Sequence, residues 1–342
     1  MAKFPKPAYN TQFGESYIGN SLELLEALED ESVNLVMTSP PFALQRKKAY
    51  GNEDQAEYVD WFTQFAILVK KKLKPDGSFV VDFGGAYMKG VPVRSLYNFR
   101  VLIKLVDEVG FHLAEDFYWF NPSKLPSPIE WVNKRKLRVK DSVDTVWWFS
   151  KTEFPKSDIT KVLAPYSDRM KKLIEDPEKF YEAKERPSGH NIGKSFGKDN
   201  GGSIPPNLLQ IPNSEATSLY LRRCKQIGIK AHPARFPAKL PEFFIKMLTD
   251  EGDLVLDIFG GSNTTGHVAE QLNRRWKSFE LSNEYVAASA LRFLPETSTQ
   301  EQLKDTYEKI LEGQSISLNN IADFEDNSRT ENIVSFKKAY GG

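Results

Sequence analysis

The tetrapeptide Ser39-Pro40-Pro41-Phe42 follows the apolar run 33–37 and presents one hydroxyl group and one aromatic ring. Proline fixes its own φ and restricts the residue before it, so the proline pair holds these groups at one place. The exocyclic amine of cytosine or adenine is a poor nucleophile because its lone pair is delocalised into the ring, and its methylation needs acceptors for the amine hydrogens. The Ser39 hydroxyl and the Pro40 carbonyl are suitable acceptors. Phe42 offers a face on which an extruded base can stack.

Asp82 is an ionisable residue near the end of the apolar run 78–83. A serine hydroxyl is too weak a base to remove an amine proton by itself, so Ser39 needs a stronger acceptor nearby. Asp82 is suited to polarise Ser39 or to accept the amine hydrogen directly. The alternatives are an ordinary turn at 39–42 and a capping carboxylate at Asp82, and the residue types alone leave both open.

A second candidate site is a small-residue loop between an expected strand and an expected helix, and it contains Asp257, Phe259, Gly260, Gly261, Ser262, Asn263, Thr264 and Thr265. Such a loop lets the backbone approach an anionic group at a helix N-terminus, and Glu280 follows where an acidic residue can bind ribose hydroxyls. The spaced glycines of dinucleotide sites and the Lys-Ser/Thr pair of phosphate loops are missing. S-adenosylmethionine fits better because it carries a carboxylate in place of phosphates. A turn without any ligand is the alternative.

The elements that would position these groups alternate between helices and strands. Helical spacing of apolar residues predicts helices over 61–73, 96–109, 239–248 and 284–293, and another after Thr265. Short apolar runs predict strands over 33–37, 78–83, 117–120, 143–149, 254–257 and 276–280. This alternation predicts an α/β fold with a mostly parallel sheet covered by helices on both faces.

Two segments depart from this alternation. Residues 151–228 are rich in proline, glycine, serine and charge, and we expect little regular core structure there. Beyond Pro295 the chain is polar, with one helical patch near 303–311, and its apolar content is too low for a second core.

The composition excludes several kinds of protein. The 46 Lys and Arg residues balance the 46 Asp and Glu residues, so a nucleic-acid surface must be a local patch. Because Cys224 is the one cysteine, an internal disulfide is excluded. Enzymes that attack cytosine C6 with a thiolate usually carry a Pro-Cys pair, and Cys224 has no proline beside it. The histidines show no metal-ligand spacing, so no metal is expected. No apolar run approaches the roughly 20 residues that span a bilayer, and we expect a cytoplasmic bacterial protein.

The two motifs together resemble those of the amino-group DNA methyltransferases. A Ser-Pro-Pro-Phe/Tyr tetrapeptide is typical of the cytosine-N4 enzymes, and the catalytic motif precedes the cofactor motif as in the beta group, over 17–294. The resemblance implies a circularly permuted S-adenosylmethionine-dependent fold, flipping of the target base and a place in a restriction-modification system. Adenine-N6 methylation is the alternative, since the two chemistries differ little. An RNA amino-methyltransferase and a silent binding module are further alternatives.

The resemblance also implies residue roles. Ser39, Pro40, Phe42 and Asp82 take the target-base roles, and the loop Asp257–Thr265 binds the cofactor. Further cofactor contacts are expected from Asn20, His232, Pro233 and Glu280, with Glu280 on the ribose and Asn20 where the family often has aspartate.

Candidate contacts to duplex DNA come from the basic residues of two stretches, 124–140 and 151–228. We expect Lys and Arg there to bind phosphates and a subset to read base edges, from the set Lys124, Lys134, Arg135, Lys136, Arg138, Arg186, His190 and Lys194. The expected organisation is a catalytic half at 1–150, a target-recognition region at 151–228, a cofactor half at 229–295 and a C-terminal extension at 296–342. The protein is expected to act as a monomer or homodimer, paired in function with a cognate restriction endonuclease but without implied contact.

Overall fold

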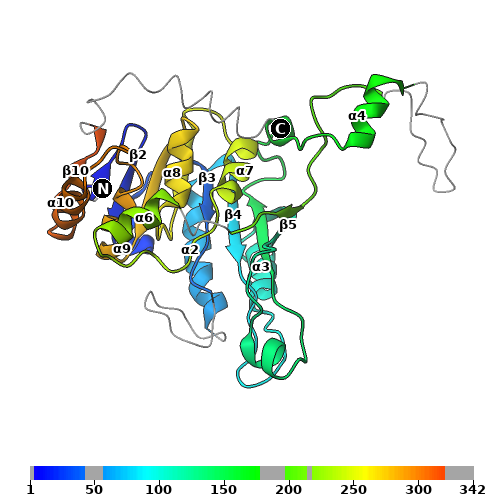
Figure 1. Cartoon of the computed structure of the whole chain (residues 1–342), viewed down its shortest axis with the longest axis horizontal. Coiled ribbons are helices and arrows are strands. Elements are labelled where there is room, and N and C mark those ends of the chain that lie inside the picture. The colour runs from blue at the N-terminus through cyan, green and yellow to red at the C-terminus, as the bar shows by residue number, and fades with distance from the viewer. Residues whose placement is uncertain (1–3, 43–56, 178–196, 214–217, 320–342) are drawn as a thin grey trace.

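A computed structural model of the chain describes residues 4–42, 57–177, 197–213 and 218–319. Within them one sheet has the strand order β10-β1-β2-β9-β8-β3-β4-β6-β5-β7, and Figure 1 shows it running from β10 on the left to β5 on the right. The strands are β1 (Tyr9–Asn10), β2 (Gly14–Ile18), β3 (Val33–Thr38), β4 (Leu73–Phe83), β5 (His112–Phe120), β6 (Val143–Ser150), β7 (Leu208–Gln210), β8 (Leu254–Asp257), β9 (Arg275–Glu280) and β10 (Ile316–Ser317).

Helices cover the two faces of the sheet. The α-helices are α1 (Ser21–Ala27), α2 (Tyr58–Lys72), α3 (Tyr97–Asp107), α4 (Asp168–Glu175), α6 (Leu219–Gln226), α7 (Lys239–Leu248), α8 (Thr264–Gln271), α9 (Asn283–Ala290) and α10 (Gln300–Leu311). A π-helix, η1 (Glu130–Lys134), and a 3₁₀ helix, η2 (Ile159–Val162), complete the set. None of the helices in the described ranges is long and apolar enough to cross a membrane.

Two hydrophobic cores lie on opposite faces of the sheet. In β3, Leu35 and Met37 belong to the core that α6 to α10 complete, whereas Val33 and Val36 belong to the core under α1, α2 and α3. Side chains of a strand point to alternate faces, so a strand covered on both faces must be apolar throughout. This explains why the strand next to the Ser39 turn is mostly apolar, and its two buried polar residues, Asn34 and Thr38, are both hydrogen-bonded.

The sheet is mixed, with a parallel centre. Strands β2, β9, β8, β3 and β4 are parallel neighbours, whereas β6 runs antiparallel to both β4 and β5. The connection 121–142 from β5 to β6 carries no crossover helix, and strands joined without such a crossover pair antiparallel. The prediction of a mostly parallel sheet with helices on both faces is therefore confirmed, with β6 and the two-residue strands β1 and β10 running against the others.

The expectation of little core structure in 151–228 is wrong for two elements. Strand β7 pairs in parallel with β5, and α6 buries Tyr220 and Cys224 in the core that α6 to α10 complete. The segment after Pro295 also joins this core through Leu303 and Ile310 of α10, and β10 pairs with β1. These elements bury only a few apolar residues each, so their periodicity is too short to recognise in a polar stretch.

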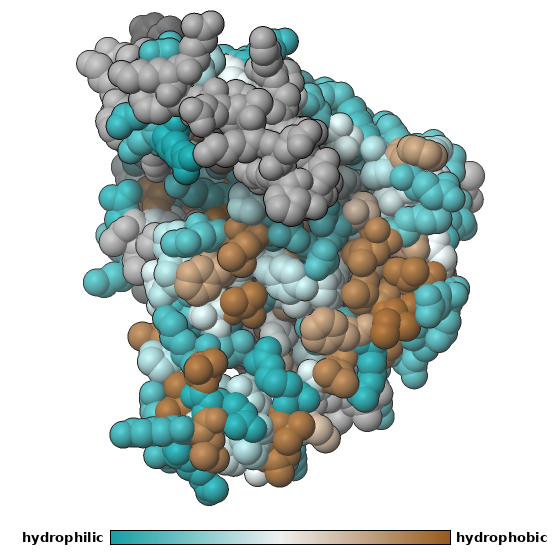
Figure 2. All heavy atoms as spheres, turned by 90° about the vertical axis from the view of Figure 1, so that its right-hand side faces the viewer, coloured by the Kyte–Doolittle hydropathy of each residue, from teal (hydrophilic) through white to brown (hydrophobic). Residues whose placement is uncertain are grey.

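Two parts of the chain lie away from the sheet. Helix α4 stands apart at the upper right of Figure 1, and the 121–142 connection extends below the sheet. Figure 2 shows apolar and hydrophilic side chains mixed on this lower part of the surface. Its most exposed apolar residues include Leu125, which is 80% exposed, and Val139, which is 86% exposed.

Candidate active site

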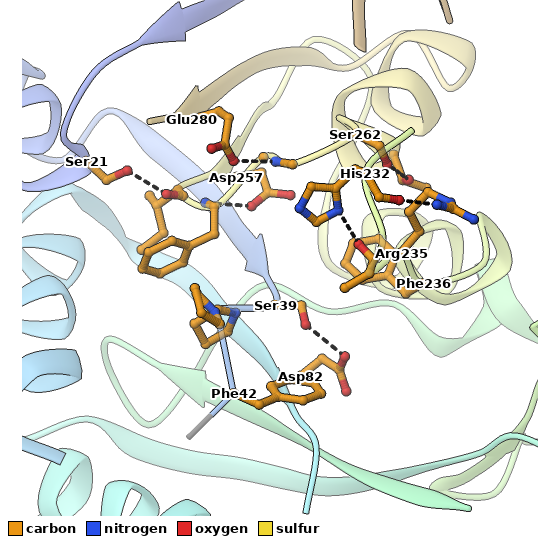
Figure 3. A pocket seen from close by; sticks show the side chains of 18 of the residues that line it. Ser21, Ser39, Phe42, Asp82, His232, Arg235, Phe236, Asp257, Ser262 and Glu280 are labelled. Carbon is orange, nitrogen blue, oxygen red and sulfur yellow. Dashed lines mark hydrogen bonds between the residues drawn. The ribbon is translucent and has the colours of Figure 1, made fainter. Parts of the chain in front are cut away.

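A cavity of about 530 Å³ opens where the parallel strands β3, β4, β8 and β9 end. Ligands of open α/β sheets bind outside the carboxyl ends of the strands. The turn after β3, the loop after β8 and the end of β9 all contribute to the wall. Figure 3 shows Ser39, Phe42 and Asp82 at one end of the cavity and Glu280 and Asp257 at the other. The two sequence motifs, more than two hundred residues apart, thus share one cavity.

At the first end, Ser39 and Asp82 interact directly. The Ser39 hydroxyl donates a hydrogen bond of 3.1 Å to Oδ2 of Asp82. Asp82 is only 2% exposed, and its Oδ1 has no hydrogen-bond partner among the described residues. Burial raises the pKa of Asp82 well above its usual range, and the nearby Asp144 raises it further. A carboxyl group in this environment has a high affinity for a proton.

Phe42 lies directly against the backbone that follows β4. A Cβ atom on Gly84 would come within 2.2 Å of the Phe42 ring, so the ring occupies the space that any other side chain would need. The Tyr97 hydroxyl donates a hydrogen bond to the Gly84 carbonyl and fixes this stretch of backbone. The aromatic face of Phe42 is thereby held beside Ser39 and Asp82.

At the other end, the two glycines of the loop after β8 have little or no space for a side chain. A Cβ on Gly260 would lie 2.0 Å from the Ser278 hydroxyl. Gly261 has φ +51°, and a Cβ on it would lie 3.1 Å from the His232 ring. Glycine is the residue that adopts such a left-handed conformation at little cost. The loop backbone therefore faces the cavity directly.

Glu280 connects β9 to this loop. Its Oε2 accepts a hydrogen bond of 2.8 Å from the Gly261 N–H, and its Oε1 accepts one of 2.9 Å from the Ser282 N–H. Burial raises the pKa of Glu280. A carboxylate has about four lone-pair sites, so Glu280, which lines the cavity, keeps acceptor sites for a ligand. Two neighbouring hydroxyl groups of a ribose would match them.

Asp257 joins the two motifs. Its Oδ1 accepts hydrogen bonds from the Thr38 hydroxyl at 2.6 Å and the Phe259 N–H at 3.0 Å, and its Oδ2 accepts one from the Thr265 hydroxyl at 2.7 Å. It is 3% exposed, and burial raises its pKa. Asp257 thus ties the residue before Ser39 to the first turn of α8.

The other predicted cofactor residues differ in position. Asn20, His232 and Pro233 line the cavity, as do Phe259, Ser262 and Thr264. Asn263 and Thr265 do not line it. Asn263 instead caps α8 by accepting from the Gly266 N–H at 3.1 Å, and it donates to the Tyr9 hydroxyl at 2.9 Å.

The predicted DNA-contact residues are also spread out. Lys124 lines the cavity and pairs with Asp144 at 3.0 Å. Lys134 and Arg135 pair with Glu130 on η1, at 3.4 and 2.9 Å. Two more basic residues of the same connection are Lys136 and Arg138, and Arg138 donates to the Pro92 carbonyl at 3.1 Å. Arg186, His190 and Lys194 lie outside the described residues.

Several cavity residues escaped the sequence analysis, among them Trp119, Asn121, Asp144, Asn213 and Arg235. Asp144 carried a usable signal, because a carboxylate inside an apolar strand is the same pattern that pointed to Asp82. Trp119 lies in β5, where its aromatic ring is an ordinary core residue by sequence, and nothing in the sequence separates Asn121, Asn213 and Arg235 from ordinary polar loop residues. Within the described residues, no cluster of three His, Cys, Asp or Glu side chains could hold a metal ion.

Comparison with known protein families gives one match that spans most of the chain. The N6/N4 family described as "DNA methylase" matches residues 33–291. This range contains the Ser39 turn, Asp82, the loop after β8 and Glu280.

Individual relatives agree with the family match. The type II methyltransferase M.PvuII of Proteus hauseri is 76% identical over 316 residues, which cover 92% of this chain and 94% of the relative. M.BglII of Bacillus subtilis is 25% identical over 285 residues, covering 83% and 69% of the two chains. A solved structure of PvuII DNA methyltransferase (cytosine-N4-specific) superposes with a TM-score of 0.77 at 65% identity, covering 92% and 98%. A putative DNA modification methylase of Thermus thermophilus shares the fold, with a TM-score of 0.50 at 18% identity and coverage of 88% and 98%.

The bond between Thr38 and Asp257 is open to a direct test. Thr38→Val removes a donor from a buried carboxylate, and we expect the free energy of unfolding to fall by about 1.5–3 kcal/mol, the range for hydrogen bonds to charged groups. Urea unfolding measures the change. The control is Thr63→Val, because the Thr63 hydroxyl bonds only the Val59 carbonyl of its own helix. Equal stability of Thr38→Val and wild type would contradict a supporting role for this bond.

Proposed function

The chain belongs to the N6/N4 DNA methylase family, and from that membership we propose that it transfers a methyl group from S-adenosylmethionine to the N4 amine of cytosine in duplex DNA. It would act as the modification component of a restriction-modification system. The observation that carries the proposal is the Ser39–Asp82 hydrogen bond in the same cavity as the loop after β8 and Glu280.

The residues at the second end of the cavity fit S-adenosylmethionine. Glu280 lines the cavity and keeps acceptor sites for the ribose hydroxyls, and the backbone at Gly260 and Gly261 allows close approach of the methionine part. His232 closes this end, with its backbone N–H bonded to the Tyr220 hydroxyl of α6 at 3.1 Å. When bound, the cofactor supplies a methyl group on a positively charged sulfur.

At the end of the cavity that holds Ser39 and Asp82, the residues of the chain bind the target amine. The Pro40 carbonyl and the Ser39 oxygen accept the two amine hydrogens, which makes the nitrogen lone pair more available. Because Ser39 already donates to Asp82, a proton that leaves N4 can pass to the Asp82 carboxylate through the serine hydroxyl. Proton transfer of this kind typically contributes about 10²–10⁴-fold to a rate.

The target cytosine must leave the helix to reach this cavity. Extrusion of a base costs a few kcal/mol, and stacking on an aromatic ring returns about 1–3 kcal/mol. Phe42 provides that ring, and Gly84 leaves room for it. We infer that the cytosine stacks on Phe42 with its amine directed at Ser39.

We place the DNA along the side of the molecule that carries η1 and α4. Lys134, Arg135, Lys136 and Arg138 of the 121–142 connection would bind phosphates there. Arg186, His190 and Lys194, which lie outside the described residues, are also proposed to contact the DNA. The position of α4 apart from the sheet in Figure 1 supports 151–228 as the target-recognition region, with β7 and α6 anchoring its end. The order of the two motifs supports a circularly permuted fold with halves at 1–150 and 229–295. The similarity to M.PvuII suggests CAGCTG as the target and a bacterial cytoplasmic setting.

Product analysis tests the proposed function. We expect the purified chain to transfer labelled methyl groups to unmethylated duplex DNA containing CAGCTG, and the nucleoside digest to contain N4-methylcytosine. N6-methyladenine would overturn the choice of base. Label on RNA alone, or cofactor binding without transfer, would overturn the proposed substrate or the proposed catalysis.

Ser39→Ala tests the catalytic role of the hydroxyl. We expect the single-turnover rate to fall on the order of 10²-fold with little change in the affinity for DNA or cofactor, because the acceptor is lost but the cavity is kept. Ser32→Ala is the matched control, since the Ser32 hydroxyl bonds the Glu29 carbonyl. An unchanged rate for Ser39→Ala would show that the hydroxyl is not used.

Glu280→Ala tests the ribose contact. We expect cofactor affinity to fall about tenfold or more, because two hydrogen bonds to a charged group are lost. Isothermal titration without DNA measures this affinity. Glu284→Ala removes an exposed carboxylate four residues away and should leave the affinity unchanged. A wild-type affinity in Glu280→Ala would place the ribose elsewhere.

A further inference from the structure

The target end of the cavity contains a second buried carboxylate beside Asp82, and the proposed chemistry does not use it. Asp144 of β6 is 5% exposed. In the β4–β6 ladder Asp82 is paired with Val146, so Asp144, two residues from Val146, points to the same face of the sheet. Lys124 donates to both oxygens of Asp144, at 3.0 and 3.4 Å. Two carboxylates and one ammonium group therefore share the target end of the cavity.

We propose that the Lys124–Asp144 ion pair is a positioning device that sets how readily Asp82 accepts the proton of the target amine. The proposal rests on the proposed function above. In this proposal, Lys124 acts at the target end of the cavity and does not bind a DNA phosphate. Lys124 and Asp144 act through Asp82 and need not touch the cytosine.

Charge balance links the ion pair to Asp82. Two neighbouring carboxylates in a buried site resist ionising together, and a nearby cation relieves this resistance. Lys124 offsets Asp144, so the group of three carries one net negative charge when Asp82 is ionised. After Asp82 accepts the amine proton, the group is neutral. The ion pair thus allows Asp82 to begin ionised and leaves no uncompensated charge in the cavity afterwards.

Asp82 has few hydrogen bonds, so nearby charges can control its protonation. Oδ2 accepts from Ser39, whereas the buried Oδ1 has no partner in the described parts of the chain. A carboxylate with so few donors depends strongly on the charges around it. Asp144 raises the pKa of Asp82, while Lys124 lowers it.

Other charged or titratable groups near the pair do not replace it. Arg94 and Asp141, on the neighbouring connections, form their own ion pair at 2.5 Å. Tyr97 of α3 faces both carboxylates, but burial raises its pKa, so the phenol stays neutral. Among the described residues, Lys124 is the cation that pairs directly with Asp144.

The test is the pH dependence of the single-turnover methylation rate. Because Asp82 must be ionised to accept a proton, the rate should rise with pH and then level off. Lys124→Met removes a positive charge, favours protonated Asp82 and should move the midpoint to higher pH by about one unit or more. Asp144→Asn removes a negative charge and should move it to lower pH. The double variant should lie between the two single variants.

A second titration does not depend on activity. The infrared carbonyl band of protonated Asp82, identified as the difference between wild type and Asp82→Asn, should shift its midpoint in the same directions without DNA present. Lys309→Met, which breaks an exposed ion pair with Asp305 on α10, should move neither midpoint. This control corrects for a general effect of removing one lysine.

The outcomes separate the two proposals. Unmoved midpoints in the infrared titration would overturn the role of the ion pair, even if methylation were normal. A weaker affinity of Lys124→Met for DNA with an unmoved midpoint would assign Lys124 to the DNA instead. If the wild-type chain methylated no DNA, the proposed function would be wrong, and the infrared shifts would still decide whether Lys124 and Asp144 control Asp82.

Discussion

The site depends first on the buried carboxylate of Asp257. It binds the hydroxyl groups of Thr38 and Thr265, which belong to segments that are far apart in the chain. The parallel pairing of β3 with β8 brings these segments together, and the three hydrogen bonds of Asp257 fix the loops that leave the two strands. A buried carboxylate is costly unless it is hydrogen-bonded, so neither loop can move away without leaving it unsatisfied. The cavity forms between the two loops that are held in this way.

The remaining carboxylates of the cavity differ in their hydrogen bonds and ion pairs, and their proposed roles differ accordingly. Glu280 accepts two backbone hydrogen bonds and keeps acceptor sites for a ligand. Asp144 is paired with a lysine. Asp82 accepts one bond, from Ser39, and has a raised pKa because it is buried next to another carboxylate. The least satisfied group is the one next to the proposed position of the target amine, where proton affinity would be useful.

Much of the fold could be predicted because strands covered on both faces must be apolar, and β3, β8 and helix α7 were recognised with nearly correct bounds. The reversed direction of β6 could not be predicted, since it depends on how the 121–142 connection returns to the sheet and not on the residues of the strand. Helix α6 was not predicted because it is short and only two of its apolar residues, Tyr220 and Cys224, are buried in the core. Two residues are too few to show a helical period. The site residues that were found carry a recognisable motif. Asn213 and Arg235 reach the cavity only through the tertiary fold.

The contact between Phe42 and Gly84 has an evolutionary consequence. The two residues come from loops after adjacent parallel strands, and the ring fills the volume that a side chain at position 84 would require. While position 42 carries an aromatic ring in this orientation, selection must keep glycine at position 84, however distant the two codons are in the gene. Among homologous sequences, a residue larger than glycine at position 84 should therefore occur only where position 42 has lost its aromatic ring or the ring has moved.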